Sequence, residues 1–135
     1  MRRRDFVILG VSALSLGGCA GARYVVPRAS PGRLVIALAD LGVEGQAFVQ
    51  TAAMPRPVYV RRLASGEWAA VLASCTHQGC QPEPAVDRLT CPCHGSEFSF
   101  EGLVLQGPAE RPLPRYEVTE EGGDVVVWLE GRGAV

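Results

Sequence analysis

Two short segments constrain this chain most, because together they hold both of its histidines and four of its five cysteines. The first reads CTHQGC over residues 75–80, and the second reads CPCHGS over residues 91–96. In each segment a cysteine stands two or three residues before a histidine, so each pair can reach one metal centre from one side. Gly79 and Gly95 allow the backbone to turn tightly and to bring N–H groups near that centre. We therefore expect the two segments to meet at a single metal site.

The residue types alone leave two alternatives open. A structural zinc site is the first, because zinc takes four thiolate and imidazole ligands in a tetrahedron. It would leave Cys80 and Cys93 unexplained, or joined as a bare disulfide. The second alternative is a small exported domain with two structural disulfides and two idle histidines.

Read together, the two segments resemble the paired motifs of the Rieske iron–sulfur proteins, Cys-x-His-x-Gly-Cys and Cys-x-x-His-Gly-Ser. In that family two histidines replace two cysteines on one iron of a [2Fe–2S] cluster. The resemblance implies one such cluster per chain. It also implies that Cys75 and Cys91 bind the buried iron, and that His77 and His94 bind the outer iron.

The resemblance extends beyond the ligands. It implies a disulfide between Cys80 and Cys93 that pins one loop to the other, as suits an exported protein. Residues 107–109 (GPA) resemble the proline loop that covers the third side of a Rieske cluster. The whole similarity spans roughly residues 33–130, and it implies an all-β fold. We expect a small Rieske-type β-sandwich or barrel that carries a cluster-binding subdomain built from the two cysteine and histidine loops.

Three positions bear on the redox potential and on the partner. Ser96 stands where high-potential members place a hydroxyl that donates to a bridging sulfide. Two residues on, those members have a tyrosine, whereas this chain has Phe98. Hydrogen bonds to cluster sulfurs help to set the potential, so we expect a value below that of the quinol-oxidising members. Gln78 stands where members of cytochrome bc complexes usually have leucine. Its polar amide argues against assigning this chain to such a complex.

The pattern of the remaining chain also favours an all-β domain over residues 33–131. Short apolar runs alternate with turn residues, and no stretch shows a sustained helical period. Residues 120–124 (EEGGD) are a hairpin signal between two of these runs. The expected strands cover residues 34–38, 57–63, 68–73, 89–90, 116–119 and 125–129.

The N-terminus has the layout of an export signal over residues 1–19. Arg3 and Arg4 precede an apolar, glycine-rich run, which resembles a twin-arginine signal. Residues 16–19 (LGGC) resemble a lipobox, so Cys19 is the expected site of lipidation. Residues 20–32 contain prolines and glycines without a clear period, and we expect them to form a tether between membrane and domain.

These features predict one-electron transfer to or from a protein partner, in a chain that is not catalytic alone. The partner is a cytochrome or an oxidoreductase subunit, either in a quinol-oxidising cytochrome bc-like complex or in a periplasmic enzyme resembling arsenite oxidase. The expected location is the periplasmic side of a membrane, to which the chain is anchored. A net charge of −1 gives no support to nucleic-acid binding. A Rieske oxygenase would need further histidines for a second iron. A zinc-stabilised binding lipoprotein without redox activity is the alternative from another class.

Overall fold

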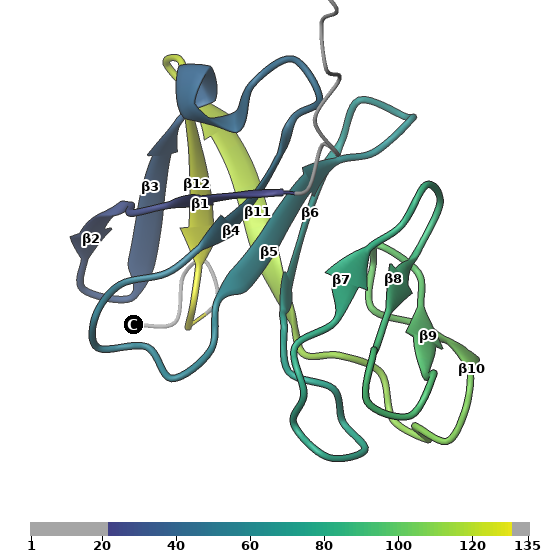
Figure 1. Cartoon of the computed structure of the whole chain (residues 1–135). Helices are drawn as coiled ribbons and strands as arrows, with labels where there is room; N and C mark the ends of the chain where they lie inside the picture. Colours follow the sequence, from purple (N-terminus) through teal and green to yellow (C-terminus); the bar gives the residue numbers. More distant parts are fainter. Residues whose placement is uncertain (1–21, 131–135) are drawn as a thin grey trace, which may run out of the picture.

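The computed structural model describes residues 22–130, which form two sheets. The larger sheet has eight strands in the order β1-β4-β5-β6-β11-β12-β3-β2. It curls upon itself, and a smaller sheet of order β10-β9-β8-β7 stands beside it (Figure 1). The strands of the larger sheet are β1 (Arg23–Val25), β2 (Arg28–Ser30), β3 (Arg33–Ala37), β4 (Gln46–Val49), β5 (Val58–Arg62), β6 (Trp68–Leu72), β11 (Arg115–Glu121) and β12 (Asp124–Trp128). Those of the smaller sheet are β7 (Glu83–Pro84), β8 (Leu89–Thr90), β9 (Glu97–Phe98) and β10 (Val104–Gln106).

The expected all-β fold is confirmed, and a single 3₁₀ turn, η1 (Leu38–Leu41), is the only helical element among residues 22–130. The expected hairpin joins β11 to β12, where Glu121 pairs with Asp124. Gly122 and Gly123 fill its two-residue turn with φ values of 55° and 85°. Such a turn needs positive φ at both central positions, and glycine adopts it without steric cost.

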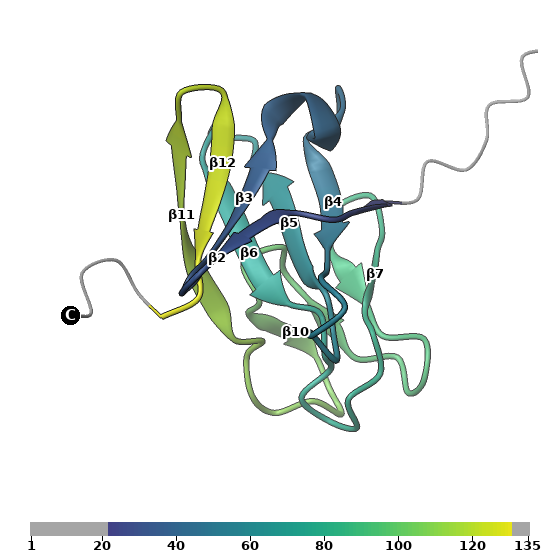
Figure 2. The same ribbon diagram turned by 90° about the vertical axis from the view of Figure 1, so that its left-hand side faces the viewer.

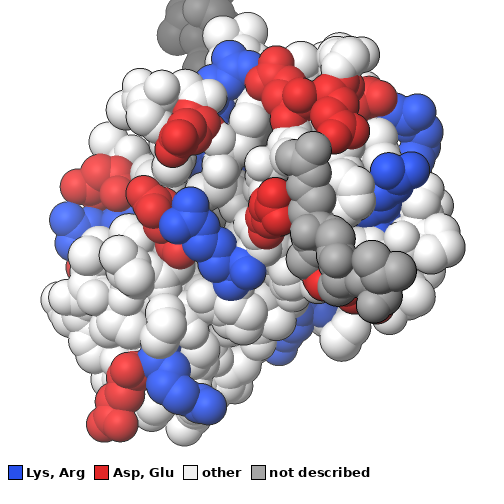
Figure 3. All heavy atoms as spheres, turned by 180° about the vertical axis from the view of Figure 1, so that it is seen from behind, with Lys and Arg blue, Asp and Glu red and all other residues white. Residues whose placement is uncertain are grey.

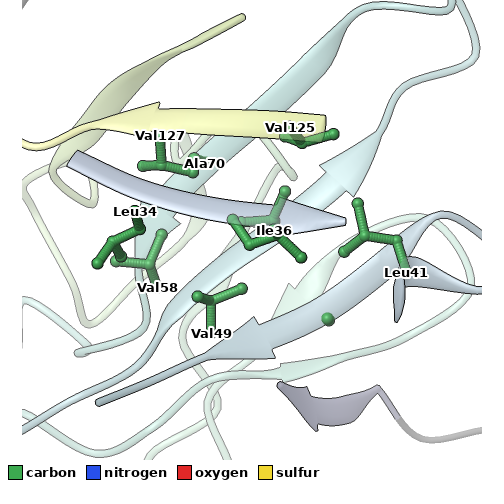
Figure 4. Packing of buried hydrophobic residues seen from close by; sticks show 10 residues of the cluster. Leu34, Ile36, Leu41, Val49, Val58, Ala70, Val125 and Val127 are labelled. Atoms are coloured by element: carbon green, nitrogen blue, oxygen red, sulfur yellow. The ribbon is translucent and has the colours of Figure 1, made fainter. Parts of the chain in front are cut away.

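The larger sheet encloses the first of two hydrophobic cores (Figure 4). Side chains alternate across a strand, so the strands between the two cores are buried on both faces. On β5, Val58 and Val60 face the first core, while Tyr59 faces the second core. Phe48 on β4 and Val71 on β6 share that second core with residues of the smaller sheet. The second core therefore joins the two sheets.

The prediction of a tether over residues 20–32 is wrong for residues 23–30. β1 pairs in parallel with β4, and β2 pairs with β3, so both belong to the larger sheet. Buried Pro27 separates these two edge strands, a position that proline tolerates because an edge leaves backbone donors unpaired. Figure 2 shows this N-terminal segment, in dark purple, running from β4 toward β3, so that β1 and β2 lie at the two ends of the strand order. The domain thus begins about ten residues earlier than the sequence suggested.

Two expectations lie outside the described residues, namely the export signal over residues 1–19 and the lipidation of Cys19. Within residues 22–130, no helix has the length and apolar character needed to span a membrane.

Candidate metal centre

The first cysteine loop joins β6 to β7 and closes on itself. The backbone N–H of Cys75 donates to the carbonyl of Cys80 at 2.7 Å. The N–H of Gly79 donates back to the carbonyl of Cys75, also at 2.7 Å. Gly79 has a φ of 75°, which lets the chain reverse directly after the loop tip. This closure holds the Cys75 thiol inside the protein while His77, at the tip, stays exposed.

The second loop joins β8 to β9 and repeats the same backbone closure. The N–H of Cys91 donates to the carbonyl of Ser96 at 2.7 Å, and the N–H of Gly95 donates to that of Cys91 at 3.0 Å. Gly95 has a φ of 78°. His94 is again exposed at the tip. Two loops of different sequence therefore have the same six-residue framework, with a cysteine at its base and a histidine near its tip.

Among the four predicted ligands, the structure places Cys75 next to Cys91 and His77 next to His94. The thiols of Cys75 and Cys91 are buried, with 3% and 1% of the residue exposed, and neither forms a disulfide. The rings of His77 and His94 meet edge to face, with 4.9 Å between their centroids. One end of the site thus offers two sulfurs in the interior, and the other end offers two imidazoles at the surface.

Burial raises the pKa of the Cys91 thiol. The backbone N–H groups of Cys93 and His94 lower it in part, while a hydrogen bond and charge interaction with Cys75 raise it. Two neighbouring thiolates in an apolar interior repel one another unless a cation lies between them. The pair is therefore suited to a positively charged metal centre.

The disulfide between Cys80 and Cys93 joins the two loops, as expected. The Sγ atoms of Cys80, Cys91 and Cys93 lie within 4.8 Å of one another. Because Cys80 and Cys93 are bonded to each other, neither offers a thiolate to a metal. The disulfide instead lies directly beside the Cys91 sulfur and fixes the two loops relative to each other.

A third loop, which follows β10, packs against the second loop. The buried hydroxyl oxygen of Ser96 accepts a hydrogen bond from the backbone N–H of Ala109 at 3.0 Å. Ala109 is itself buried and follows the cis Gly107–Pro108 peptide bond. A serine hydroxyl that accepts one hydrogen bond still has a proton to donate. Ser96 can therefore hold the third loop and donate toward the space between the cysteine loops.

A comparison with known families identifies this arrangement, because the family model described as the Rieske [2Fe-2S] domain matches residues 33–117. The chain belongs to the Rieske family. A similar relative is the cytochrome b6-f complex iron-sulfur subunit of Chlorobaculum tepidum, 42% identical over 64 residues. That match covers 46% of this chain and only 35% of the relative.

Two further comparisons cover more of the chain. The ubiquinol-cytochrome c reductase iron-sulfur subunit of Rhodospirillum rubrum is 27% identical over an alignment of 161 residues, which spans 88% of each chain. The crystal structure of the plasma membrane Rieske protein PetC3 from the cyanobacterium Synechocystis PCC 6803 is 39% identical. It superimposes with a TM-score of 0.60 over 67% of this chain and 93% of PetC3.

Membership of the Rieske family implies a [2Fe–2S] cluster, and the residues present fit that group. Two buried thiols, two adjacent exposed imidazoles and a buried serine hydroxyl are the kinds of group that such a cluster uses. Rieske centres take two cysteines and two histidines. A zinc site would use the same four donors, but the family match favours the iron–sulfur cluster.

Phe98 lies where the sequence analysis predicts a missing hydroxyl. The side chain is completely buried and packs in the second core together with Cys75 and Cys91. Its strand pairs with Leu89 on one side and Val104 on the other, which fixes the ring beneath the loops. An apolar ring at this position provides no hydrogen-bond donor to a cysteine sulfur.

Two hydrogen bonds that the sequence analysis missed tie the third loop to the Rieske site. The hydroxyl of Thr76 donates to the carbonyl of Arg111 at 2.6 Å, so it links the first loop to the third loop. The side-chain amide of Gln106 donates to the carbonyl of Gly95 at 3.4 Å. The sequence signal for Thr76 was a hydroxyl residue between the predicted ligands Cys75 and His77. Its acceptor could not be inferred, because it lies 35 residues away.

The N-terminal strand also contacts the Rieske site, which the sequence analysis did not anticipate. Tyr24 on β1 stacks on Phe48 with 5.2 Å between ring centroids. Its hydroxyl accepts a hydrogen bond of 2.6 Å from the amide of Gln81, which directly follows Cys80. β1 is thereby connected to the disulfide-bearing loop.

The surface near the two histidines carries uncharged and charged side chains. Gln78 and Pro92 are exposed in the two cysteine loops and are uncharged. Glu110 and Arg111 are exposed in the third loop, and the carbonyl of Arg111 accepts the hydrogen bond from Thr76, next to His77. Seen from behind, charged side chains cover much of the upper and middle part of the molecule, and an acidic and a basic group lie at its lower edge (Figure 3).

Proposed function

We propose that this chain transfers single electrons through a Rieske-type [2Fe–2S] cluster, as a subunit or partner of a membrane-associated redox complex. The cluster, when bound, accepts and releases one electron. Its proposed ligands are Cys75, Cys91, His77 and His94. The disulfide between Cys80 and Cys93 fixes the relative position of the two loops around the cluster.

The roles proposed for the other residues follow from burial. The thiols of Cys75 and Cys91 hold the inner side of the centre away from water. His77 and His94 provide the exposed edge at which a redox partner can make contact. Ser96 stabilises the reduced form by donating its free proton, since an added electron strengthens a hydrogen bond to sulfur. Phe98 adds no second donor, and the potential is expected to lie below that of the quinol-oxidising members.

The observation that supports this proposal best is that matching loop frameworks carry two neighbouring buried thiols and two neighbouring exposed imidazoles. Visible and reduced-state EPR spectra of the purified protein test it. We expect the rhombic EPR signal of a histidine-ligated [2Fe–2S] cluster. His77→Ala should abolish that signal, whereas Gln78→Ala, at the next exposed position in the chain, should retain it. A colourless protein that contains zinc would overturn the proposal and support a structural site.

We further propose that residues 1–19 direct export and that the chain is anchored at the periplasmic side, with lipid on Cys19. The arginine pair, the apolar run and the small residues before Cys19 support this assignment. Mass spectrometry of the mature protein should find a lipid-modified N-terminal cysteine. Cys19→Ala should release the cluster-bearing domain from the membrane fraction or leave the signal uncleaved. An unmodified, soluble wild-type chain would refute the anchor.

A second candidate function is quinol oxidation within a cytochrome bc-like complex. The names of the relatives from Chlorobaculum tepidum and Rhodospirillum rubrum favour it. The polar side chain of Gln78 at the exposed tip weighs against it. Co-purification with a cytochrome b and quinol-dependent reduction of the cluster would support this candidate, whereas co-purification with a soluble oxidoreductase would exclude it.

A further inference from the structure

β1 fastens the start of the domain to both cores. Ala22 packs against the second core, and Val25 packs against the first. The carbonyl of Val25 accepts a hydrogen bond of 3.1 Å from the N–H of Gln50, and Tyr24 bonds Gln81. The chain is therefore held in place from residue 22 onward, and no flexible segment of the described domain precedes the sheet.

This placement leaves a very short connection to the proposed anchor. Only Ala20 and Gly21 separate Cys19 from Ala22. Three peptide steps span at most about 11 Å. The same limit applies if the apolar run over residues 6–22 is retained as an anchor. Whichever anchor is present, the face of the domain around Ala22 must lie close to the lipid surface.

That face carries two protruding apolar side chains. Val43, in the loop before β4, is 107% exposed, and Val86, in the turn between β7 and β8, is 94% exposed. Val43 lines a hollow together with Ala22 and Arg23, and Val86 lines another together with Arg61. Both hollows share Glu44, so the two valines protrude from one surface that also carries charged side chains. Apolar tips beside a lipid anchor are suited to contact with the membrane interface.

The Rieske site lies at the opposite end of the smaller sheet. The first cysteine loop leads into β7, and β8 leads into the second, while the turn with Val86 joins the other ends of the same two strands. Figure 1 shows this turn at the upper end of the smaller sheet and the loops before β7 and after β8 at the lower end. A membrane at the Val86 end therefore leaves the two histidines on the aqueous side.

We propose that the surface formed by Val43 and Val86 rests on the lipid bilayer, so that the Rieske site faces away from it toward a water-soluble or peripheral redox protein. This inference rests on the membrane attachment in the proposed function and adds an orientation to it. It also disfavours direct reduction by a quinol within the bilayer, because β1 prevents the domain from turning over on a long tether.

Tryptophan substitutions in the full-length chain test the orientation. Val43→Trp and Val86→Trp are compared with Leu105→Trp, which lies in β10 next to Gln106 and thus near the second cysteine loop. All three positions are exposed, so the substitutions leave the cores intact. The proteins are reconstituted into vesicles of phosphatidylethanolamine and phosphatidylglycerol, with or without brominated phosphatidylcholine. The fluorescence of the unsubstituted chain is subtracted.

Brominated lipid should reduce the fluorescence of the tryptophans at positions 43 and 86 and leave that at position 105 unchanged. Quenching at position 105 alone, or equal quenching at all three positions, would overturn the orientation while membrane attachment stands. A chain that fails to sediment with vesicles would overturn both the attachment and this inference. Loss of the [2Fe–2S] spectrum in a protein with the expected quenching would instead refute the redox part of the proposed function.

Discussion

Replacing Ser96 with alanine should reduce both the stability and the redox potential, through two different atoms of one hydroxyl. Its oxygen is completely buried and accepts the N–H of Ala109 at 3.0 Å. Because Ala109 is also buried, the variant leaves that N–H without an acceptor. An unsatisfied buried donor costs about 1–3 kcal/mol of unfolding free energy. For a domain of this size each kcal/mol lowers the melting temperature by about 4 °C or more.

The hydroxyl proton of Ser96 determines the second effect. If it donates to a cluster sulfur, its removal destabilises the reduced state relative to the oxidised state. A difference of about 1 kcal/mol corresponds to about 40 mV for one electron, since a tenfold change in equilibrium is 59 mV. Thermal unfolding followed by circular dichroism measures the first effect, and an EPR-monitored redox titration measures the second.

Thr76→Val is the matched control. It removes another hydroxyl that fastens a cysteine loop to the third loop, but the Thr76 proton is already donated to the carbonyl of Arg111. We expect a smaller loss of stability there and an unchanged potential. An unchanged melting temperature in Ser96→Ala would refute its role in holding Ala109. A lower melting temperature with an unchanged potential would show that the hydroxyl does not donate to the cluster.

Three further predictions follow from the same structure. Phe98→Tyr should raise the redox potential by about 40 mV if the new hydroxyl stabilises the reduced state by about 1 kcal/mol. A redox titration that shows no increase would contradict the expectation that Phe98 lowers the potential by providing no donor. Replacing Cys80 and Cys93 together with serine should lower the unfolding free energy by about 3 kcal/mol, because the disulfide closes a loop with a sequence separation of 13 residues. Urea unfolding measures this loss, and a value well below about 1 kcal/mol would contradict the prediction. Burial raises the pKa of Tyr59 above its usual 10.0, so its contribution to stability is complete below that pH and is lost as the pH rises toward the folded-state pKa. Tyr59→Phe should therefore flatten the decline in urea-unfolding stability above pH 10, and an unaltered decline would argue against this residue as its source.

The strands with one clear pattern were predictable from the sequence, whereas β4 was not. Residues Gln46–Val49 are all buried, because one face of β4 meets the first core and the other meets the second. Gln46 interrupts what would otherwise be an apolar run, yet its amide oxygen accepts hydrogen bonds from the hydroxyl of Tyr59 and the guanidinium of Arg61, and its amide nitrogen donates to Glu44. The two donors to the amide oxygen lie 13 and 15 residues away, so the local sequence does not show how that oxygen is satisfied in the interior.

The error at the N-terminus has a related cause. Prolines and glycines between residues 27 and 32 suggest a tether, and they do end each short strand. What orders β1 is the stacking of Tyr24 on Phe48 and its hydrogen bond to Gln81, at a sequence separation of 57. Short edge strands carry a weak local pattern, because their stability comes from tertiary contacts rather than from their own residues.

The Rieske site itself was predictable to the extent that it is local. Each cysteine loop closes through hydrogen bonds within six residues, so residue type and spacing are sufficient to indicate the loop and its candidate metal ligands. The contacts that fix the loops to the rest of the protein are not local, since the acceptor of Thr76 lies 35 residues away and Ser96 is separated from Ala109 by 13. A motif can therefore identify the chemistry of the centre, while its orientation relative to a membrane or a partner depends on the fold. For this reason the orientation that we propose for the histidines rests on β1 and the smaller sheet, and could not have been inferred from the motifs.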